Sequence, residues 1–135
     1  MKTHPRREFL LRVLAACGTP LFAPSVSLRA GQAPLERGSQ AAARYFGAGA
    51  AAARAIGEAY LRQLQLPPER ESILEHTRGA LDIIASARTQ PAATTALVAA
   101  VRRDFQEGRV VQLEGWIVSR TEVELCVLTL LPGPV

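Results

Sequence analysis

The chain has 135 residues, enough for one domain with a hydrophobic core, and 48% of them are hydrophobic, which excludes a compositionally disordered chain. Its net charge of +4 comes entirely from residues 1–30, because residues 31–135 hold 11 arginines and 11 acidic residues. A domain that binds nucleic acid keeps an excess of basic residues on its folded surface. The charge balance after residue 30 therefore argues against a nucleic-acid partner.

Two adjacent arginines near the start of the sequence form an export pattern. Arg6 and Arg7 are followed by Phe9 and Leu10, which matches the R-R-x-F-L core of bacterial twin-arginine signals, and an apolar stretch comes next. The uncharged run over residues 13–28 is shorter than the roughly 20 residues that a membrane-spanning helix needs, and two prolines interrupt it. Residues 1–30 are therefore predicted to be a signal peptide for the twin-arginine translocase, with a periplasmic destination.

The processing of this signal has three alternatives. Cleavage after Ala30 fits the small Gly31 that follows it, and cleavage after Ser27 also has small residues nearby. The third alternative is lipidation, because residues 14–17 read Leu-Ala-Ala-Cys and fit the pattern in which the cysteine becomes acylated. Cys17 is therefore the candidate lipid anchor of a membrane-associated form.

After the signal, residues 31–39 contain Gly, Pro and polar residues and are predicted to be a linker before a helical domain over residues 40–135. Residues 40–66 are predicted to be helical, with three glycines that weaken the prediction. Prolines then start a second helix, to about residue 87, and a third, over residues 91–107, that Gly108 ends. The predicted apolar faces are Ile73, Thr77, Ala80, Leu81 and Ile84 on the second helix, and Leu97, Val98, Val101 and Phe105 on the third.

The pattern changes after Gly108 from helical spacing to extended character. Residues 109–118 are β-branched and partly alternating around Glu114-Gly115, which predicts a short β-hairpin with a two-residue turn. Ser119 and Glu122 then fit a capping box at the start of a last, strongly apolar helix over residues 121–131. The predicted fold class is mainly α: a small antiparallel helical bundle with a short β-hairpin before its last helix.

The side chains that catalysis or metal binding needs are scarce after residue 30. His76 is the one histidine and Cys126 the one cysteine there, and no cluster has the spacing of a zinc site. The Gly-Ala-Gly at 47–49 lacks the preceding strand of a phosphate-binding loop. We expect His76 to be a solvated or capping residue, and Asp104 and Glu107 to belong to an exposed, ion-paired helix face. No catalytic residue, metal ligand or cofactor is therefore predicted.

Trp116 and Cys126 are the candidates for contact with another chain. Trp116, the single tryptophan, either covers the small core, which we favour, or anchors an interface, since tryptophan is enriched in both settings. If Cys17 leaves with the signal, Cys126 has no internal disulfide partner. In an oxidising compartment Cys126 is then either a buried core residue, the favoured reading, or paired with another chain.

Taken in order, these segments are similar to a known family. The twin-arginine signal, the helical I-G-E-A-Y-L at residues 56–61 and the ending V-V-Q-L-E-G-W-I-V-S-R-T-E-V-E-L-C at residues 110–126 resemble the small subunits of exported flavin-dependent sugar and alcohol dehydrogenases, the gluconate 2-dehydrogenase subunit 3 type. The signal and the stretch G-W-x-x-S-x-T-E at residues 115–122 are its specific parts. The resemblance implies that this chain carries the signal for a large flavoprotein that lacks one, while a cytochrome c subunit takes the electrons.

We therefore expect a non-catalytic subunit that escorts and stabilises an exported oxidoreductase. The alternative is a free-standing periplasmic binding module, or a lipoprotein anchored through Cys17. A third hypothesis, a small enzyme that acts through Cys126, has the least support from the sequence.

Overall fold

The computed structural model describes the backbone of residues 24–132 and the side chains of residues 32–132. The chain divides into two units, Met1–Ala30 and Gly31–Val135, and the second holds the folded domain. Outside the described residues lie the positions of the predicted export signal and lipid anchor, Arg6, Arg7, Phe9, Leu10 and Cys17.

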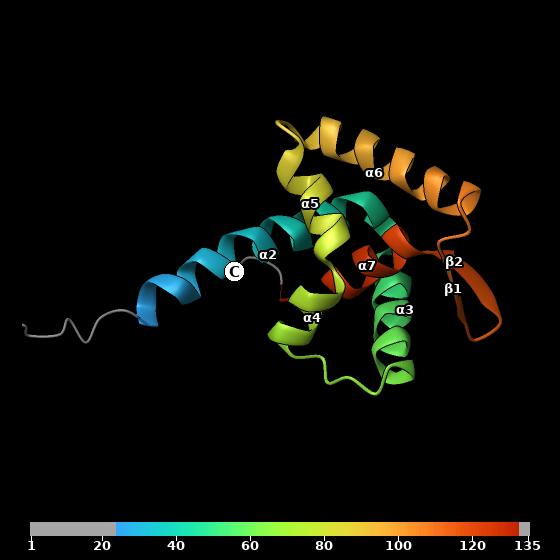
Figure 1. Cartoon of the computed structure of the whole chain (residues 1–135), viewed down its shortest axis with the longest axis horizontal. Coiled ribbons are helices and arrows are strands. Elements are labelled where there is room, and N and C mark those ends of the chain that lie inside the picture. The colour runs from blue at the N-terminus through green and yellow to red at the C-terminus, as the bar shows by residue number, and fades with distance from the viewer. Residues whose placement is uncertain (1–23, 133–135) are drawn as a thin grey trace, which may run out of the picture. The chain divides into compact units, whose positions relative to one another are not determined.

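The described chain is mainly α-helical, with one hairpin before the last helix, which confirms the predicted fold class (Figure 1). The hairpin strands pair antiparallel, with Leu113 opposite Trp116 next to the turn. In chain order the elements are α2 (Pro24–Phe46), the short 3-10 helix η1 (Gly47–Gly49), α3 (Ala50–Gln63), α4 (Arg70–His76), α5 (Arg78–Ser86), α6 (Gln90–Gln106), β1 (Val110–Leu113), β2 (Trp116–Ser119) and α7 (Arg120–Leu128).

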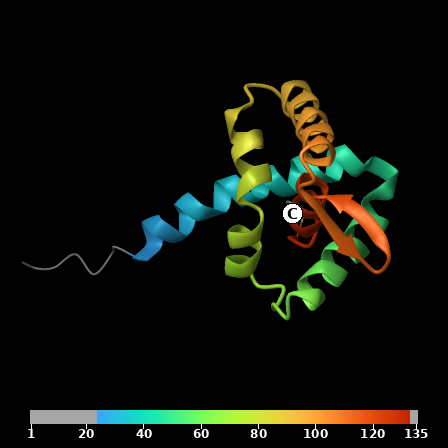
Figure 2. The same ribbon diagram turned by 45° about the vertical axis from the view of Figure 1, so that its right-hand side comes forward.

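The last helix, α7, forms the centre of the domain. Every residue from Val123 to Leu128 is buried, and α7 contacts α3, α4, α5, α6 and both strands (Figures 1 and 2). A helix that buries six consecutive residues must have neighbours that cover it on every side. The surrounding elements therefore pack their apolar faces onto α7, and the core includes Leu35, Ala42, Leu61, Ile73, Leu81, Leu97, Leu125 and Leu128.

The predicted linker over residues 31–39 is wrong, because helix α2 runs through it. Leu35 and Ser39 are buried in the domain, one helical turn apart. Gly38 lies between them, and a Cβ atom there would be 2.6 Å from Leu81 Cδ2 and 3.2 Å from Leu128 Cδ2. The glycine that suggested a linker is thus a contact point, where α2 approaches the core closely.

The predicted helical segment over residues 40–66 is present but divided. Gly47 has φ +50°, a left-handed conformation that other residues adopt only with strain, and the chain turns there between α2 and α3. Gly57 has the opposite role inside α3. A Cβ atom at Gly57 would lie 2.5 Å from the carbonyl oxygen of Cys126, so the glycine allows α3 to pack directly on the backbone of α7.

The predicted second helix is also divided, into α4 and α5, with Thr77 between them at φ −125° and ψ 13°. The predicted apolar face is nevertheless confirmed, because its five residues are all buried. Thr77 itself is fully buried, and its hydroxyl donates to the carbonyl oxygen of Ile73 at 2.7 Å. The side chain of Thr77 therefore bonds back to α4 and provides no cap for α5.

Helix α6 lies where the sequence predicts a third helix. Thr89 caps it by accepting from the backbone N–H of Ala92 at 3.3 Å, and Gly108, at φ +69°, follows its end. The predicted apolar face is only partly buried. Leu97 is enclosed in the core, whereas Val98 and Phe105 are exposed.

Candidate functional site

The hairpin presents apolar side chains to solvent at its turn. Glu114 and Gly115 both have positive φ, 48° and 87°, which is the requirement of the two-residue turn that matches the twist of paired strands. This geometry confirms the predicted turn and places Trp116 directly opposite Leu113 on one face of the hairpin. Leu113 is buried, whereas Trp116 is 76% exposed and Ile117 is 64% exposed.

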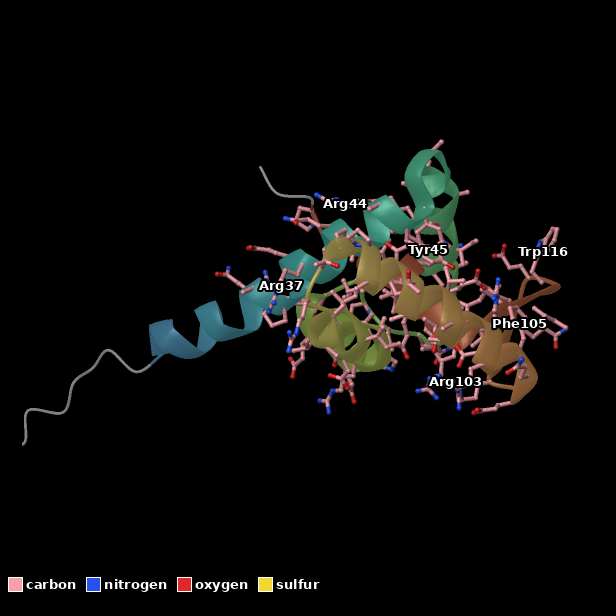
Figure 3. All side chains as sticks on the ribbon, turned by 90° about the horizontal axis from the view of Figure 1, so that it is seen from above. Arg37, Arg44, Tyr45, Arg103, Phe105 and Trp116 are labelled. Carbon is pink, nitrogen blue, oxygen red and sulfur yellow. The ribbon has the colours of Figure 1, made fainter. Side chains whose placement is uncertain are left out.

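The favoured prediction for Trp116, a cover over the core, is therefore wrong. Extended chains point successive side chains to opposite faces, and on the face that carries Leu113 and Trp116, Val111 and Val118 are half-buried, Leu113 is buried and Trp116 is exposed. Figure 3 shows Trp116 at the same end of the domain as Phe105, which is 49% exposed at the end of α6. Both aromatic side chains thus remain in contact with solvent.

A hollow of about 480 Å³ lies between α3 and the hairpin. Two alanines one helical turn apart, Ala55 and Ala59, leave space on the α3 side, and the hairpin supplies larger apolar side chains opposite them. We call this the apolar α3–hairpin surface; its residues are Ala55, Ile56, Ala59, Leu113, Trp116, Ile117 and Val118.

The charged side chains along this surface pair with each other. Arg62 Nη2 lies 3.9 Å from Glu114 Oε1 across the hollow, and both side chains are largely exposed. Exposed ion pairs contribute little to stability. The consequence here is that the lining of the hollow carries one positive and one negative side chain, Arg62 and Glu114.

The base of the hairpin is fixed by a buried carboxylate, Asp104, which is only 3% exposed. Its Oδ1 accepts from Arg109 Nε at 2.9 Å, and its Oδ2 accepts from the backbone N–H of Thr121 at 2.7 Å. The contacts join α6, the residue before β1 and the first turn of α7. Burial raises the pKa of Asp104, but the hydrogen bonds from Thr121 and Arg109 and the charge of Arg109 outweigh it, and the pKa lies below its ordinary value.

The expected exposed, ion-paired face of α6 is therefore corrected at Asp104. Glu107 is exposed as expected, and its carboxylate pairs with the Arg109 guanidinium. Asp104 lies on the inner side, because its partners are the first amides of α7 and an arginine from the next segment. Those partners become neighbours only when the hairpin folds back, and the local charge pattern contains no sign of them.

Ser119 confirms the predicted cap at the start of α7. Its hydroxyl oxygen accepts from the backbone N–H of Glu122 at 3.0 Å. Together with Asp104, it satisfies two of the amides that a helix leaves free at its N-terminus. The strand β2 thus passes into α7 through a fully buried and hydrogen-bonded residue.

A second buried carboxylate, Glu124, was not singled out from the sequence. Its Oε2 accepts from the backbone N–H of Ala80 at 2.6 Å, and its Oε1 lies 3.4 Å from Arg120 Nε. A Cβ atom at Gly79 would lie 2.9 Å from this carboxylate, so Gly79 leaves room for it. Burial raises the pKa of Glu124, although the bond from Ala80 and the charge of Arg120 act in the other direction. The sequence feature that could have identified Glu124 is its position between two apolar residues, Val123 and Leu125.

Cys126 and His76, the two residues considered for nucleophilic chemistry, both make contacts within the folded domain. Cys126 is 1% exposed, and burial, with a smaller contribution from the charge of Glu122, raises the pKa of its thiol to about 12. The favoured prediction of a core cysteine is confirmed, and its assignment to a partner interface is wrong for that reason. His76 Nδ1 lies 2.9 Å from the carbonyl oxygen of Ser72, within the last turn of α4.

The described residues were also compared with the requirements of metal sites and of membrane-spanning helices. Among residues 32–132, no group of three or more Cys, His, Asp or Glu side chains is placed to hold a metal ion. No helix in the described part of the chain combines the length and the apolar character that crossing a membrane requires.

Comparison with known proteins returned no relatives. No protein-family model, no curated protein and no solved structure matches this chain.

Proposed function

We propose that this chain is a non-catalytic small subunit that escorts and stabilises an oxidoreductase, a flavin-dependent dehydrogenase, through the twin-arginine pathway to the periplasm. The observation that carries the proposal is the apolar α3–hairpin surface, where Trp116 and Ile117 are mostly exposed beside a hollow. Exposed apolar patches with a polar border are typical of protein interaction sites, and tryptophan is enriched among the residues that dominate binding energy.

The export pattern at residues 6–10 supports a role for this surface in holding a partner during export. The twin-arginine pathway carries proteins that have already folded, so a subunit with the signal can carry a bound partner that lacks one. Such an escort needs a stable contact before export, and an apolar surface supplies it. The resemblance to dehydrogenase small subunits supports the same division of labour, with flavin chemistry in the large subunit and a cytochrome c subunit as electron acceptor.

Co-purification tests this proposal. The full chain carries a C-terminal tag, is expressed in its own host and is purified from the periplasm, and the bound flavin and the ratio of the proteins are measured. The expected result is one large flavoprotein in equimolar amount. A tagged chain that emerges alone and monodisperse would contradict the proposal.

A second candidate, a free-standing binding module, is favoured by the volume of the hollow. Its roughly 480 Å³ falls in the range of small-molecule sites, and Arg62 and Glu114 add polar groups at its border. The lipoprotein form of this candidate depends on Cys17 and is tested by labelling with radioactive palmitate. A labelled wild-type chain with an unlabelled Cys17→Ser variant is the expected result for that form, and an unlabelled wild-type chain excludes it.

A further inference from the structure

Exposed apolar area is concentrated at the hairpin. Trp116 and Ile117 are 76% and 64% exposed, whereas Val98 and Leu74, on other helices, are exposed to 37% and 36%. The two hairpin residues border the same hollow as Ala55 and Ile56 of α3. Small side chains of α3 therefore form one wall of the hollow. Larger side chains of the hairpin form the other wall, with the indole of Trp116 at its end.

The shape of the surface suits a helix. On α3 the two alanines lie at positions i and i+4, along one of the rows of side chains that form ridges on a helix surface. A ridge of apolar side chains from a second helix fits above these alanines, and the indole of Trp116 then packs along its side. An amphipathic helix that lies in an apolar groove is a recurring mode of protein recognition.

The charges of the surface restrict what can cover it. Arg62 pairs with Glu114 across the hollow, so the two charged side chains that line it already have a partner of opposite sign. An occupant that brought unpaired charges would have to desolvate them without compensation. Glu114 also lies in the hairpin turn beside Trp116, which disfavours contact with a bilayer of anionic lipids.

The hairpin is held in place before any partner binds. Asp104 joins Arg109, at the entry to β1, to the first turn of α7, and Ser119 joins the end of β2 to the same turn. Gln63 of α3 donates to the carbonyl oxygen of Gln112 at 3.3 Å, which ties β1 to the opposite wall. A surface that is already ordered loses little entropy on binding.

From the shape, the charge balance and the fixed hairpin, we propose that the apolar α3–hairpin surface binds an uncharged, apolar ridge of a helix in the large partner subunit, with Trp116 as its anchor. The inference rests on the proposed function and specifies the contact through which the escort holds its partner.

Two substitutions and two matched controls test this contact in the full, tagged chain. Ala55→Glu fills the hollow with a charged side chain, and Trp116→Ser removes the anchor; both positions are exposed, so folding is retained. Ala85→Glu places the same charge on α5, and Leu74→Ser removes an exposed apolar side chain from α4. We expect the two test variants to lower partner affinity by roughly 30-fold or more, and the controls to change it less than about threefold.

A photo-reactive amino acid in place of Trp116 identifies what the surface touches. The expected cross-link joins an uncharged stretch of a helix in the flavin-bearing partner. Cross-links to a second copy of this chain or to lipid would overturn the inference. So would test variants that retain the partner as well as the wild-type chain does, and in that case the escort proposal would survive. A wild-type chain that carries no partner at all would remove both.

Discussion

Asp104 and Glu124 are two buried carboxylates that stabilise helix N-termini from different elements. Asp104 bonds the first turn of α7, and Glu124 bonds the first turn of α5. Their titration differs because hydrogen bonds from Thr121 and Arg109, with the charge of Arg109, outweigh burial at Asp104, whereas burial dominates at Glu124. The pKa is lowered at Asp104 and raised at Glu124. Each carboxylate therefore couples the stability of the domain to pH with the opposite sign.

Asp104→Asn should lower the free energy of unfolding at neutral pH by about 2–4 kcal/mol, because an amide leaves the buried contacts to Arg109 and Thr121 without their charge. Urea unfolding measures the change. Glu107→Gln is the control, since Glu107 pairs with the same arginine at the exposed surface, and it should cost less than about 1 kcal/mol. Equal effects of the two substitutions would contradict the role of Asp104.

Glu124 gives the pH-dependent prediction. Its pKa is higher in the folded chain than in the unfolded one, so its contribution to stability is complete below the ordinary carboxyl pKa and is lost as pH rises through the folded pKa. Glu124→Gln keeps an acceptor for Ala80 but does not titrate. The stability of the wild-type chain relative to this variant should therefore fall between acidic and neutral pH. A difference that stays constant or rises over that range would contradict the prediction.

At the scale of elements, helices α3 and α7 pack so closely that only glycine fits at their crossing. The carbonyl of Cys126 occupies the space in which a side chain at Gly57 would begin. Both sides of the contact are helical backbone, which cannot move aside as a flexible side chain can. The crossing therefore fixes how α3 lies on the central helix, and with it one wall of the apolar α3–hairpin surface.

Gly57→Ala should destabilise the domain by about 1–3 kcal/mol, although alanine is the better helix former. The added methyl group would lie 2.5 Å from the Cys126 oxygen. Gly49→Ala is the matched control, because Gly49 has φ −81° and no atom within 4 Å of the added group. That variant should be neutral or more stable by less than about 1 kcal/mol. Thermal unfolding followed by circular dichroism compares them, and a stabilised Gly57→Ala would contradict the close crossing.

The elements predicted correctly from sequence are those with local signals. The proline at the start of α6, the Glu114-Gly115 turn and the Ser119 cap each act within a few residues, so their spacing is visible in the chain. The helix over residues 31–39 was missed because Gly38 serves a contact with Leu81, far away in sequence. The inner position of Asp104 was missed for the same reason.

The candidate site, too, could be predicted from the sequence only in part. The sequence selected Trp116 and predicted its hairpin, but alternation within a strand did not show which way the indole faces. The hollow could not be predicted at all, because Ala55 and Ala59 belong to a helix distant in sequence from the hairpin.

At the scale of the whole molecule, the described domain has a packed interior and leaves the apolar α3–hairpin surface exposed. The interior is held by α7 and by two buried carboxylates, and the open surface carries the single tryptophan. The tryptophan fluorescence of this chain therefore reports on the proposed contact.

Acrylamide should quench Trp116 in the isolated, folded chain nearly as well as in the unfolded chain, because the indole is 76% exposed. Binding of the large subunit should protect it and shift its emission to shorter wavelength, once the partner's own fluorescence is subtracted. A Trp116→Phe chain, which keeps an aromatic side chain at the anchor position, supplies that background in the complex. Strong protection in the isolated chain would contradict the exposed position of Trp116.

The most direct test of the escort account follows the partner across the inner membrane. Arg6 and Arg7 are both changed to Lys in the host, with Arg12→Lys as the control, and the flavoprotein is quantified in cytoplasmic and periplasmic fractions. We predict that the flavoprotein remains in the cytoplasm with the double variant and reaches the periplasm with the control. A flavoprotein that still reaches the periplasm when both arginines are replaced would contradict the account.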